Sequence, residues 1–312
     1  MKEEIYDLII IGAGPAGITA AIYAKRQRLN LLLIAKEIGG QINRKAVKIE
    51  NFPGILEISG KELIERFLSH LKKYEIKMEI DEVTEVKKKE DFFSVKTKQN
   101  KEFLAKTIIV ASGATPRPLS IPGEKEFLGK GVSYCVTCDA PLFKGKKVAV
   151  IGGGNAGFEA AIFLANFAEK IYILEFFDKV RAEKENQEKA QRTGKIEVIT
   201  NAQVKEIKGD NFVKSLIYQD RISQNLKELS VDGVFVEIGN IPATSFVKDL
   251  VDFNKRNEII VEFETMATKT PGIFAAGDCN AGRYKQIITA CGEGAKAALS
   301  VYDYLQQKKA KD

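Results

Sequence analysis

The sequence has 312 residues, of which 45% are hydrophobic and 29% are charged, and its net charge at pH 7 is +6. This length suits two domains of ordinary size, and this composition excludes a disordered chain and a membrane protein. The apolar runs have strand length and are too short to span a bilayer, and the spread of positive charge does not predict a nucleic-acid stripe. The N-terminus carries no signal-peptide core, which predicts a cytoplasmic protein.

A cycle of strand, glycine-rich turn, helix and strand comes first. The apolar residues 5–11 predict a buried parallel strand, the alanine-rich residues 18–28 a helix, and residues 30–35 a second strand. The turn between the first strand and the helix reads Gly12-Ala13-Gly14-Pro15-Ala16-Gly17. These glycines allow a tight turn, close approach of a pyrophosphate and close helix packing, with the helix N-terminus facing the phosphate. The pattern therefore predicts a dinucleotide site.

The same pattern includes an acidic residue that binds a ribose, about twenty residues after the glycines at the end of the second strand. Here the strand is expected to end at Ala35-Lys36-Glu37, so the ribose contact is left open. Further on, residues 61–74 predict an amphipathic helix that carries His70 as a surface or partly packed residue. Residues 77–110 alternate and predict an antiparallel meander that ends in a buried strand at 107–111.

A second cycle of the same kind follows. Residues 147–151 predict a strand, 158–167 a helix and 170–174 another strand, and the turn reads Gly152-Gly153-Gly154-Asn155-Ala156-Gly157. Glu175 then stands 23 residues after Gly152, where the pattern expects its acidic residue. A carboxylate there hydrogen-bonds the ribose 2′-hydroxyl and repels a 2′-phosphate, which favours NADH over NADPH.

The remaining segments set the domain boundaries. Residues 196–237 predict another antiparallel meander, 272–276 a short strand before Gly277-Asp278, and 287–305 a long helix. Three prolines between residues 116 and 123 indicate a linker. The sequence therefore predicts an α/β protein of two Rossmann-like (three-layer ββα) nucleotide-binding domains, the second inserted in the first. The first domain is expected to comprise residues 1–115 and 244–312, and the second residues 116–243.

The inserted domain contains Cys135-Val136-Thr137-Cys138-Asp139. A Cys-x-x-Cys pair lowers the pKa of one thiol, and Asp139 supplies a carboxylate in reach of the sulfur for proton transfer. Zinc would need four ligands, and the chain offers one histidine besides Cys279 and Cys291, which eleven residues separate. No metal is therefore expected, and Cys279 and Cys291 are interpreted as small hydrophobic residues.

Taken together, these motifs resemble the low-molecular-weight thioredoxin reductases over essentially the whole chain. The stretches that carry the resemblance are 12–17, Gly39-Gly40-Gln41, Glu50-Asn51-Phe52-Pro53-Gly54, Ala111-Ser112-Gly113-Ala114, 135–139 and Gly277-Asp278. The resemblance implies FAD in the first domain and a pyridine nucleotide in the second. Hydride would pass from the nicotinamide to the flavin, then to the dithiol, and then to a protein disulfide.

The resemblance also implies roles for single residues. Cys138 would receive electrons near the flavin, Cys135 would attack the partner disulfide, and Asp139 would act as acid or base. Asp278 would contact the ribityl chain, and Gln286 and Ile287 the flavin ring. The expected FAD residues are Gly12, Gly14, Pro15, Ala16, Gly17, Gly40, Gln41, Asn51, Gly113, Gly277, Asp278, Gln286 and Ile287. The expected nicotinamide-nucleotide residues are Gly152, Gly154, Asn155, Gly157, Glu175 and Arg181. A homodimer and a rotation of one domain against the other are expected as well.

Two departures from this family bear on the electron donor and acceptor. Members that use NADPH carry a His-Arg-Arg cluster where this chain has Glu175-Phe176-Phe177, with Arg181 as the only nearby arginine. Residues 174–176, 284–288 and 292–297 are similar to the NADH-linked flavoprotein component of alkyl hydroperoxide reductase. That flavoprotein has an additional N-terminal disulfide-relay domain, whereas this sequence starts at the first strand, so a separate protein is expected to accept the electrons.

The predicted function is FAD-dependent reduction of a thioredoxin- or glutaredoxin-like protein, with NADH preferred. Three alternatives remain open: the same reductase supplied by another donor such as ferredoxin, a reductase partner of a peroxide-removal system, and a non-catalytic flavin redox sensor.

Overall fold

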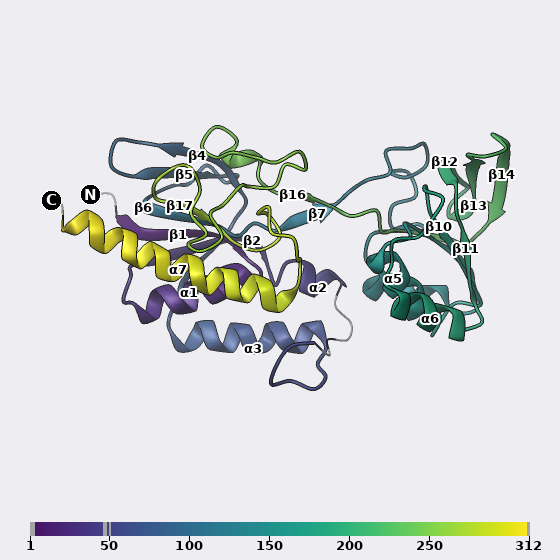
Figure 1. Cartoon of the computed structure of the whole chain (residues 1–312), viewed down its shortest axis with the longest axis horizontal. Coiled ribbons are helices and arrows are strands. Elements are labelled where there is room, and N and C mark those ends of the chain that lie inside the picture. The colour runs from purple at the N-terminus through teal and green to yellow at the C-terminus, as the bar shows by residue number, and fades with distance from the viewer. Residues whose placement is uncertain (1–3, 46–48, 50, 311–312) are drawn as a thin grey trace. The chain divides into compact units, whose positions relative to one another are not determined.

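The computed structural model describes residues 4–45, 49 and 51–310, and the chain divides into two compact units (Figure 1). Unit 1 comprises Met1–Thr115 and Ile241–Asp312, and unit 2 comprises Pro116–Asn240. The second boundary lies three residues earlier than the sequence placed it. Two short strands carry the chain between the units, β7 (Ala114–Pro116) and β16 (Asn240–Pro242), and they pair with each other.

Unit 1 is built on a seven-stranded sheet in the order β3-β2-β1-β6-β5-β4, with β17 also paired to β6. The strands are β1 (Ile5–Ala13), β2 (Leu31–Ile38), β3 (Lys77–Ile80), β4 (Val83–Lys88), β5 (Phe93–Thr97), β6 (Glu102–Val110) and β17 (Ile273–Ala275). The meander predicted over 77–110 is wrong at its start, because β3 pairs in parallel with β2, with Leu32 opposite Lys77. Strands β4, β5 and β6 are antiparallel as predicted.

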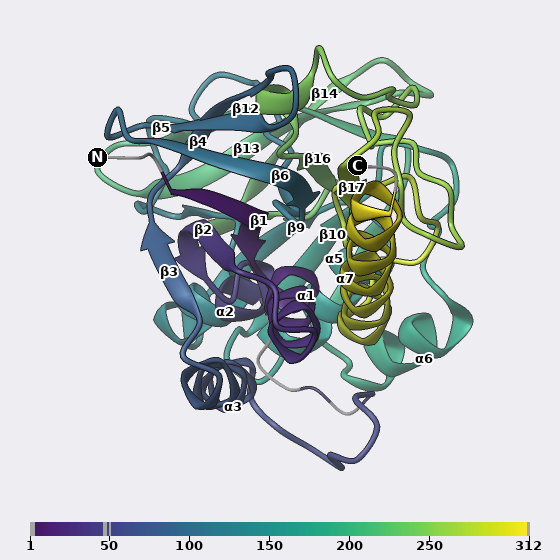
Figure 2. The same ribbon diagram turned by 90° about the vertical axis from the view of Figure 1, so that its left-hand side faces the viewer.

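The described residues of unit 1 form the α-helices α1 (Pro15–Arg26), α2 (Gln41–Lys45), α3 (Gly60–Lys73) and α7 (Ile287–Lys309). A short 3-10 turn, η2 (Ser245–Val247), lies in the same unit. Helices α1 and α7 lie side by side against the sheet (Figures 1 and 2). They pack closely because Gly294 has no side chain: a Cβ there would stand 2.1 Å from the carbonyl oxygen of Ala16.

The core of unit 1 explains why its first strand is an unbroken apolar run. Leu8, Ile9 and Ile10 are all fully buried, so both faces of β1, which pairs in parallel with β2 and β6, are covered. Helix α3 begins with a capping box in which Ser59 and Glu62 bond each other's backbone N–H groups. His70 lies exposed on this helix, with its ring 5.4 Å from that of Tyr74.

Unit 2 contains a five-stranded parallel sheet in the order β11-β10-β9-β15-β8 and an antiparallel sheet β12-β13-β14. The parallel strands are β8 (Val132–Ser133), β9 (Lys147–Ile151), β10 (Lys170–Leu174), β11 (Ile196–Ile199) and β15 (Gly233–Val236). The antiparallel strands are β12 (Ala202–Gly209), β13 (Val213–Asp220) and β14 (Leu226–Ser230). The single meander predicted over 196–237 is therefore wrong at both ends, because β11 and β15 join the parallel sheet.

The helices of unit 2 are α4 (Val136–Asp139), the 3-10 turn η1 (Ala140–Phe143), α5 (Asn155–Leu164) and α6 (Lys184–Arg192). The sequence did not predict α6. Strand β9 separates two cores: Val148 and Val150 pack with Phe158 of α5, whereas Ala149 and Ile151 belong to the cluster of the antiparallel sheet. Unit 2 therefore has three layers, with its parallel sheet between helices and a second sheet.

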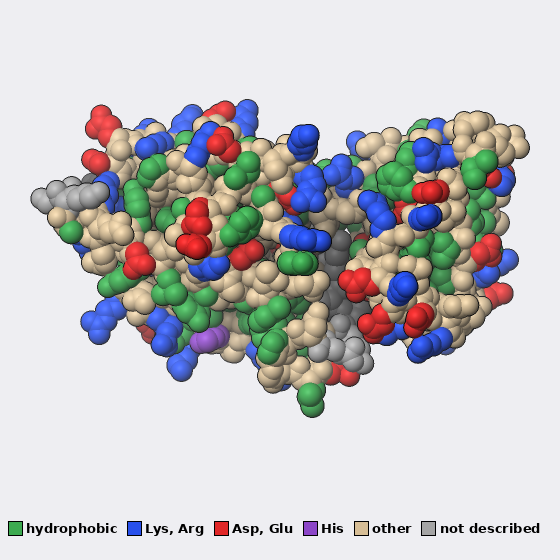
Figure 3. Space-filling model, in the orientation of Figure 1, with side chains coloured by type: hydrophobic (Ala, Val, Ile, Leu, Met, Phe, Trp, Pro, Cys, Tyr) green, Lys and Arg blue, Asp and Glu red, His purple; other side chains and the backbone are tan. Residues whose placement is uncertain are grey.

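The surface carries charges of both signs, and Lys and Arg are interspersed with Asp and Glu on the face of each unit in view (Figure 3). Within the described ranges, no helix is long and apolar enough to cross a membrane.

Candidate functional site

The first glycine turn joins β1 to α1, and each glycine has a different steric reason to be there. Gly12 has φ +111°, and a Cβ on it would lie 2.2 Å from the carbonyl oxygen of Ala111. A Cβ on Gly17 would lie 1.8 Å from the carbonyl oxygen of Gly12. Gly14 has no atom within 4 Å of that position. Gly12 and Gly17 therefore shape the turn, and Gly14 leaves open space at the N-terminus of α1.

Other predicted residues gather around this helix N-terminus. A Cβ on Gly40 would stand 3.8 Å from the Cα of Gly14, and one on Gly277 would stand 3.0 Å from the Cβ of Ala16. Pro15 occupies the first turn of α1, where its missing N–H has no intrahelical partner to lose. The helix has no side-chain cap and no acidic residue in its first turn. Its backbone N–H groups and positive dipole end suit an anion.

Two hydrogen bonds join side chains that are far apart in the sequence. Gln41 Nε2 donates to Asp278 Oδ2 at 2.7 Å, and Asn51 Nδ2 donates to Gln286 Oε1 at 3.3 Å. Gln286 is the residue before α7, and Ile287 begins the helix. The structure thus pairs four of the residues that the resemblance assigned to FAD.

Two further positions in unit 1 bear on the flavin site: Gly113, which the resemblance assigned to FAD, and Glu37, at the strand end where the ribose contact was left open. Gly113 has φ +66°, and its carbonyl oxygen accepts from the backbone N–H of Ala243 at 3.0 Å. Glu37 lies inside β2, which continues to Ile38 rather than ending before it. The carboxylate therefore stands near the end of the second strand, as the dinucleotide pattern requires.

The second glycine turn, between β9 and α5, repeats the first. Gly152 has φ +118°, and a Cβ there would lie 2.4 Å from the carbonyl oxygen of Glu237. A Cβ on Gly157 would lie 1.8 Å from the carbonyl oxygen of Gly152, whereas Gly154 again has open space. Helix α5 starts at Asn155 without a side-chain cap. Asn155 Oδ1 accepts from the backbone N–H of Glu183 at 2.7 Å, which ties the turn to the segment before α6.

Glu175 closes over this turn from the end of β10. Its Oε2 accepts from the N–H of Gly153 at 2.6 Å, and its Oε1 accepts from the N–H of Phe177 at 3.0 Å. The residue is only 3% exposed. A Cβ on Gly153 would lie 2.7 Å from Oε2, so this glycine is required for the carboxylate to approach the turn.

An arginine contacts each of the two phenylalanines that follow Glu175. The Arg181 guanidinium carbon is 4.9 Å from the ring centroid of Phe177, and that of Arg221 is 3.9 Å from the ring centroid of Phe176. Arg181 is the arginine near Glu175 in the sequence, and the turn after β13 brings Arg221 to the end of β10 as well. No local pattern in the sequence indicates this contact, although the two adjacent phenylalanines are a visible signal.

The redox motif lies between β8 and η1. Cys135 precedes α4 and is disulfide-bonded. Its backbone N–H donates to Ser133 Oγ at 2.9 Å, and its carbonyl oxygen accepts from the N–H of Asp139 at 3.2 Å. Asp139 is the last residue of α4, so its position relative to Cys135 is set by a single helical turn. The side chain of Cys138 lies outside the described residues.

A buried carboxylate holds the residue before the motif. Glu124 is 2% exposed and accepts from the backbone N–H groups of Leu119 and Ser120 at 2.6 and 2.7 Å. It also accepts from the Tyr134 hydroxyl at 2.5 Å. Burial, followed by this hydrogen bond to Glu124, raises the pKa of Tyr134. Sequence reasoning did not identify this pair.

The other two cysteines are free thiols. Burial raises the pKa of Cys279 to about 11, and its Sγ donates to the carbonyl oxygens of Val110 and Ala276. Burial also raises the pKa of Cys291. Both thiols are therefore poor nucleophiles near neutral pH. Across the part of the chain that the structure describes, no group of three or more His, Cys, Asp or Glu residues could hold a metal ion.

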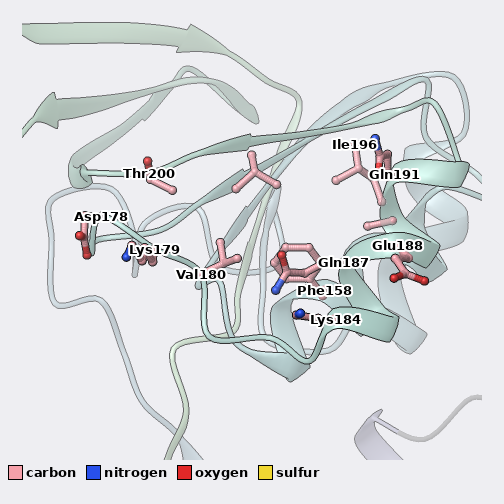
Figure 4. A pocket seen from close by; sticks show the side chains of 12 residues that line it. Phe158, Asp178, Lys179, Val180, Lys184, Gln187, Glu188, Gln191, Ile196 and Thr200 are labelled. Atoms are coloured by element: carbon pink, nitrogen blue, oxygen red, sulfur yellow. The ribbon is translucent and has the colours of Figure 1, made fainter.

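Unit 2 also has a hollow of about 790 Å³ between α6 and β11 (Figure 4). Apolar side chains such as Phe158, Val180 and Ile196 line it, and Lys184 and Glu188 stand among its polar residues. The polar residues carry both signs of charge, so the hollow has no clear electrostatic preference for a ligand.

Comparison with known proteins assigns the chain to a class. A family model described as pyridine nucleotide-disulphide oxidoreductase matches residues 6–294. The chain belongs to this family.

The relatives refine this class. The chain is 42% identical over 308 residues to a component of the alkyl hydroperoxide reductase of Pseudomonas aeruginosa, which covers 97% of this chain and 59% of that protein. It is 41% identical over 304 residues to a Bacillus subtilis protein named NADH dehydrogenase, covering 97% of this chain and 59% of that protein. The chain thus spans about three-fifths of the length of these relatives. The crystal structure of Lactococcus lactis thioredoxin reductase in its FR conformation matches with a TM-score of 0.92 and 37% identity, covering 97% of this chain and 99% of that one.

These findings confirm three predictions. The resemblance to low-molecular-weight thioredoxin reductases, the α/β fold of two Rossmann-like domains, and FAD and a pyridine nucleotide as cofactors all follow from the family and the structural match. The family and the structural match are those of disulfide oxidoreductases.

Proposed function

We propose that this protein reduces a disulfide in a thioredoxin- or glutaredoxin-like protein and uses NADH as its preferred electron donor. In the overall reaction, NADH and one proton reduce one partner disulfide to two thiols and leave NAD⁺. The observation that carries the proposal is a disulfide-bonded Cys135 at the start of α4, in a unit that also has its own dinucleotide turn.

FAD is assigned to unit 1 because the first turn fits a dinucleotide. The open position at Gly14 and the uncapped N-terminus of α1 suit a pyrophosphate. The hydrogen bonds of Asp278 with Gln41 and of Gln286 with Asn51 support a shared flavin site, because the resemblance assigns all four residues to FAD. When bound, FAD supplies the two-electron chemistry that links hydride donation by a nicotinamide to disulfide reduction.

The three residues of the redox motif have distinct proposed roles. Cys138 receives electrons on the flavin side, and Cys135 attacks the partner disulfide as a thiolate. Asp139 holds or delivers the proton that the departing thiolate needs, and its place in the same helical turn as Cys135 supports this role. Cys279 and Cys291 have no part in the reaction, since burial raises the pKa of each thiol.

NADH is preferred because the residue at the end of β10 is a buried carboxylate. Glu175 presents negative charge where the adenosine ribose lies in such turns, and this charge repels a 2′-phosphate. The 41% identity to a Bacillus subtilis protein named NADH dehydrogenase supports the same donor.

One alternative acceptor has specific support. The 42% identity to a component of an alkyl hydroperoxide reductase favours a reductase that serves peroxide removal, in which the acceptor belongs to a peroxidase system. Turnover with a thioredoxin, a glutaredoxin-like protein and a peroxiredoxin separates these acceptors.

The test of the proposed function is spectral and uses the flavin-loaded enzyme without oxygen. We expect NADH to bleach the flavin absorbance, and a disulfide partner to restore it. Cys135→Ser and Cys138→Ser should keep the flavin but lose disulfide reduction, whereas the control Cys291→Ser should keep full turnover. Bleaching by reduced ferredoxin and not by NADH would establish a different donor. Absence of turnover with every partner would support the redox-sensor alternative.

A further inference from the structure

The aromatic pair that follows Glu175 has an arginine on each ring. Phe176 and Phe177 stand edge to face, with centroids 5.2 Å apart and an interplanar angle of 84°. The guanidinium carbon of Arg221 lies 3.9 Å from the Phe176 centroid, closer than Arg181 lies to Phe177. Phe176 is nevertheless 42% exposed, so part of its surface remains open to a ligand.

Hydrogen bonds hold both the guanidinium and the backbone of Arg221. Its Nη1 donates to the carbonyl oxygen of Phe176 at 2.9 Å, and its backbone N–H donates to the carbonyl oxygen of Asn201 at 2.8 Å. The turn that carries it is tied by Asp220, which accepts from the N–H groups of Ile222 and Ser223 and pairs with Lys227 at 2.8 Å. The guanidinium is therefore held in place before any ligand arrives.

Arg221 and Phe176 lie next to the residue that is proposed to contact the nucleotide. Phe176 directly follows Glu175, whose carboxylate meets the glycine turn through Gly153. In a dinucleotide bound at such a turn, the acidic residue contacts the adenosine ribose, and the adenine is one bond from that ribose. Side chains next to Glu175 in the structure are therefore the candidates to contact the base. A planar guanidinium and an aromatic ring are the groups on which bases stack in proteins.

Scattered exposed hydrophobic side chains are ordinary on protein surfaces and need no explanation. Phe176 and Phe177 differ because they are adjacent, each carries a cation, and both border the carboxylate of a dinucleotide turn. Arg221 comes from the turn between β13 and β14, whereas Phe176 follows β10. If Phe176 served local packing alone, this contact with an arginine from another part of unit 2 would not be required.

We propose that Arg221, held on Phe176, forms with it the wall that binds the adenine of the pyridine nucleotide. This inference rests on the proposed function, because it assumes that a dinucleotide binds at the second glycine turn. It assigns to Arg221 a share of the affinity for the adenosine half and none for the nicotinamide half.

The test compares ligands that contain different halves of NADH. ADP-ribose has the adenine, both riboses and the diphosphate, and reduced nicotinamide mononucleotide has the nicotinamide half alone. Calorimetric titration of the full-length, flavin-loaded protein gives the Kd for ADP-ribose without any electron transfer. Anaerobic flavin bleaching gives the response to NADH and to the mononucleotide.

In Arg221→Leu and Phe176→Ala we expect the Kd for ADP-ribose to rise about tenfold, in line with the loss of one stacked base. The Kd of the double variant should exceed that of either single variant by much less than a further factor of ten, because the two side chains act as one wall. Bleaching by the mononucleotide should not change. Arg221→Lys keeps the charge but loses the planar group, so it should also weaken ADP-ribose, and it provides a second test if Arg221→Leu does not fold. Arg192→Leu is the matched control, since Arg192 is exposed on α6 and pairs with Glu188.

An unchanged Kd for ADP-ribose in Arg221→Leu and Arg221→Lys overturns the inference and leaves the proposed function intact, provided that NADH still bleaches the flavin. Failure of the wild type to bind either ADP-ribose or NADH overturns the proposed donor and this inference together. Equal weakening of ADP-ribose and of the mononucleotide also overturns the inference, because it would indicate general damage to unit 2.

Discussion

Both oxygens of Glu175 accept backbone hydrogen bonds inside unit 2, yet the side chain also carries the charge that is proposed to select the nucleotide. Each carboxylate oxygen has a second lone pair, so the group can hold the glycine turn and still accept a ribose hydroxyl. The same residue thus links the local fold to the choice of donor. Substitution separates the two contributions, because glutamine keeps the shape and removes the charge.

We therefore expect Glu175→Gln to lower the ratio of kcat/KM for NADH to that for NADPH by about tenfold or more, because the repulsion of a 2′-phosphate is lost. The amide nitrogen of the new glutamine would face the backbone N–H of Gly153 or Phe177 and could not accept from it. The loss of this hydrogen bond should lower the free energy of unfolding by about 1–3 kcal/mol. Steady-state kinetics and urea unfolding measure the two effects. Glu197→Gln, an exposed ion-paired residue on β11, is the control. An unchanged ratio in Glu175→Gln would remove Glu175 from the choice of nucleotide.

The glycine turn of unit 2 offers a matched pair of substitutions at the scale of the element. Gly154→Ala places its methyl group in open space, so the unfolding midpoint should not change. The affinity for NADH should fall about tenfold, because the methyl group fills the approach to the N-terminus of α5. In Gly157→Ala the methyl group meets the carbonyl oxygen of Gly152, which should lower the free energy of unfolding by at least about 1–3 kcal/mol. Calorimetry and urea unfolding give both values. Equal stability of the two variants would contradict the steric assignment.

The hydrogen bond from Tyr134 to Glu124, just before the redox motif, should make the stability of the protein depend on pH. Tyr134→Phe leaves the buried Glu124 with one donor fewer, which should lower the free energy of unfolding at pH 7 by about 1.5–3 kcal/mol. Burial and the hydrogen bond to Glu124 raise the Tyr134 pKa above its ordinary value of 10.0. The contribution of Tyr134 is therefore fully present below pH 10 and is lost as the pH rises through the folded-state pKa.

The difference in stability between wild type and Tyr134→Phe should consequently narrow above pH 10. Urea unfolding at pH 7 and at about pH 11 measures it. A difference that stays constant over this range would show that the tyrosine hydroxyl is not held as the structure describes. Tyr172→Phe serves as the control: Tyr172 packs against the same buried cluster as Tyr134, but the hydrogen bonds to Glu124 come from Leu119, Ser120 and Tyr134.

These elements also show what the sequence could and could not predict. Both strand–turn–helix cycles were predictable because their constraints are local: the glycines, the apolar strand and the helix lie within a few residues. Helix α6 was missed because it is polar, with Ala190 as its one buried residue, so no apolar stripe marks it. Strands β3 and β11 alternate like the strands of a meander, and only pairing with β2 and β10 reveals that they are parallel.

The candidate site likewise contains residues that local motifs predict and contacts that only the tertiary fold creates. Gln41 and Asp278 were each predictable from motifs, but their 2.7 Å hydrogen bond joins residues 237 positions apart. Arg221 reaches Phe176 only because the turn after β13 folds against the end of β10. The adjacent phenylalanines stand out in the sequence, but no local pattern connects them to Arg221. Contacts made by tertiary packing leave no short-range pattern, and these are the contacts that the structure adds.

At the scale of the whole molecule, the insertion of unit 2 separates the two nucleotide sites along the chain. Unit 2 is continuous in sequence, and its two buried clusters are built from its own residues. We therefore expect residues 116–240, expressed alone, to unfold cooperatively and to bind ADP-ribose about as tightly as the full chain does. Circular dichroism in urea and calorimetric titration test this expectation. A fragment that lacks a cooperative transition would show that unit 2 depends on unit 1 for its stability.

Unit 1 is discontinuous, yet its two pieces meet where the chain leaves it and returns. Thr115 Oγ1 donates to the carbonyl oxygen of Ile241 at 3.4 Å, and the N–H of Ala243 donates to the carbonyl oxygen of Gly113 at 3.0 Å. A short Gly/Ser loop from Thr115 to Ile241 should therefore close unit 1 at little cost in entropy. We expect this protein to bind FAD and to show a flavin spectrum, but to respond to NADH far more slowly than the full chain, because the second glycine turn is gone. Gly17→Ala in the same protein should lose the flavin, since its methyl group meets the carbonyl oxygen of Gly12. Rapid bleaching by NADH without unit 2 would place the donor site in unit 1 and overturn the division of labour proposed for the two units.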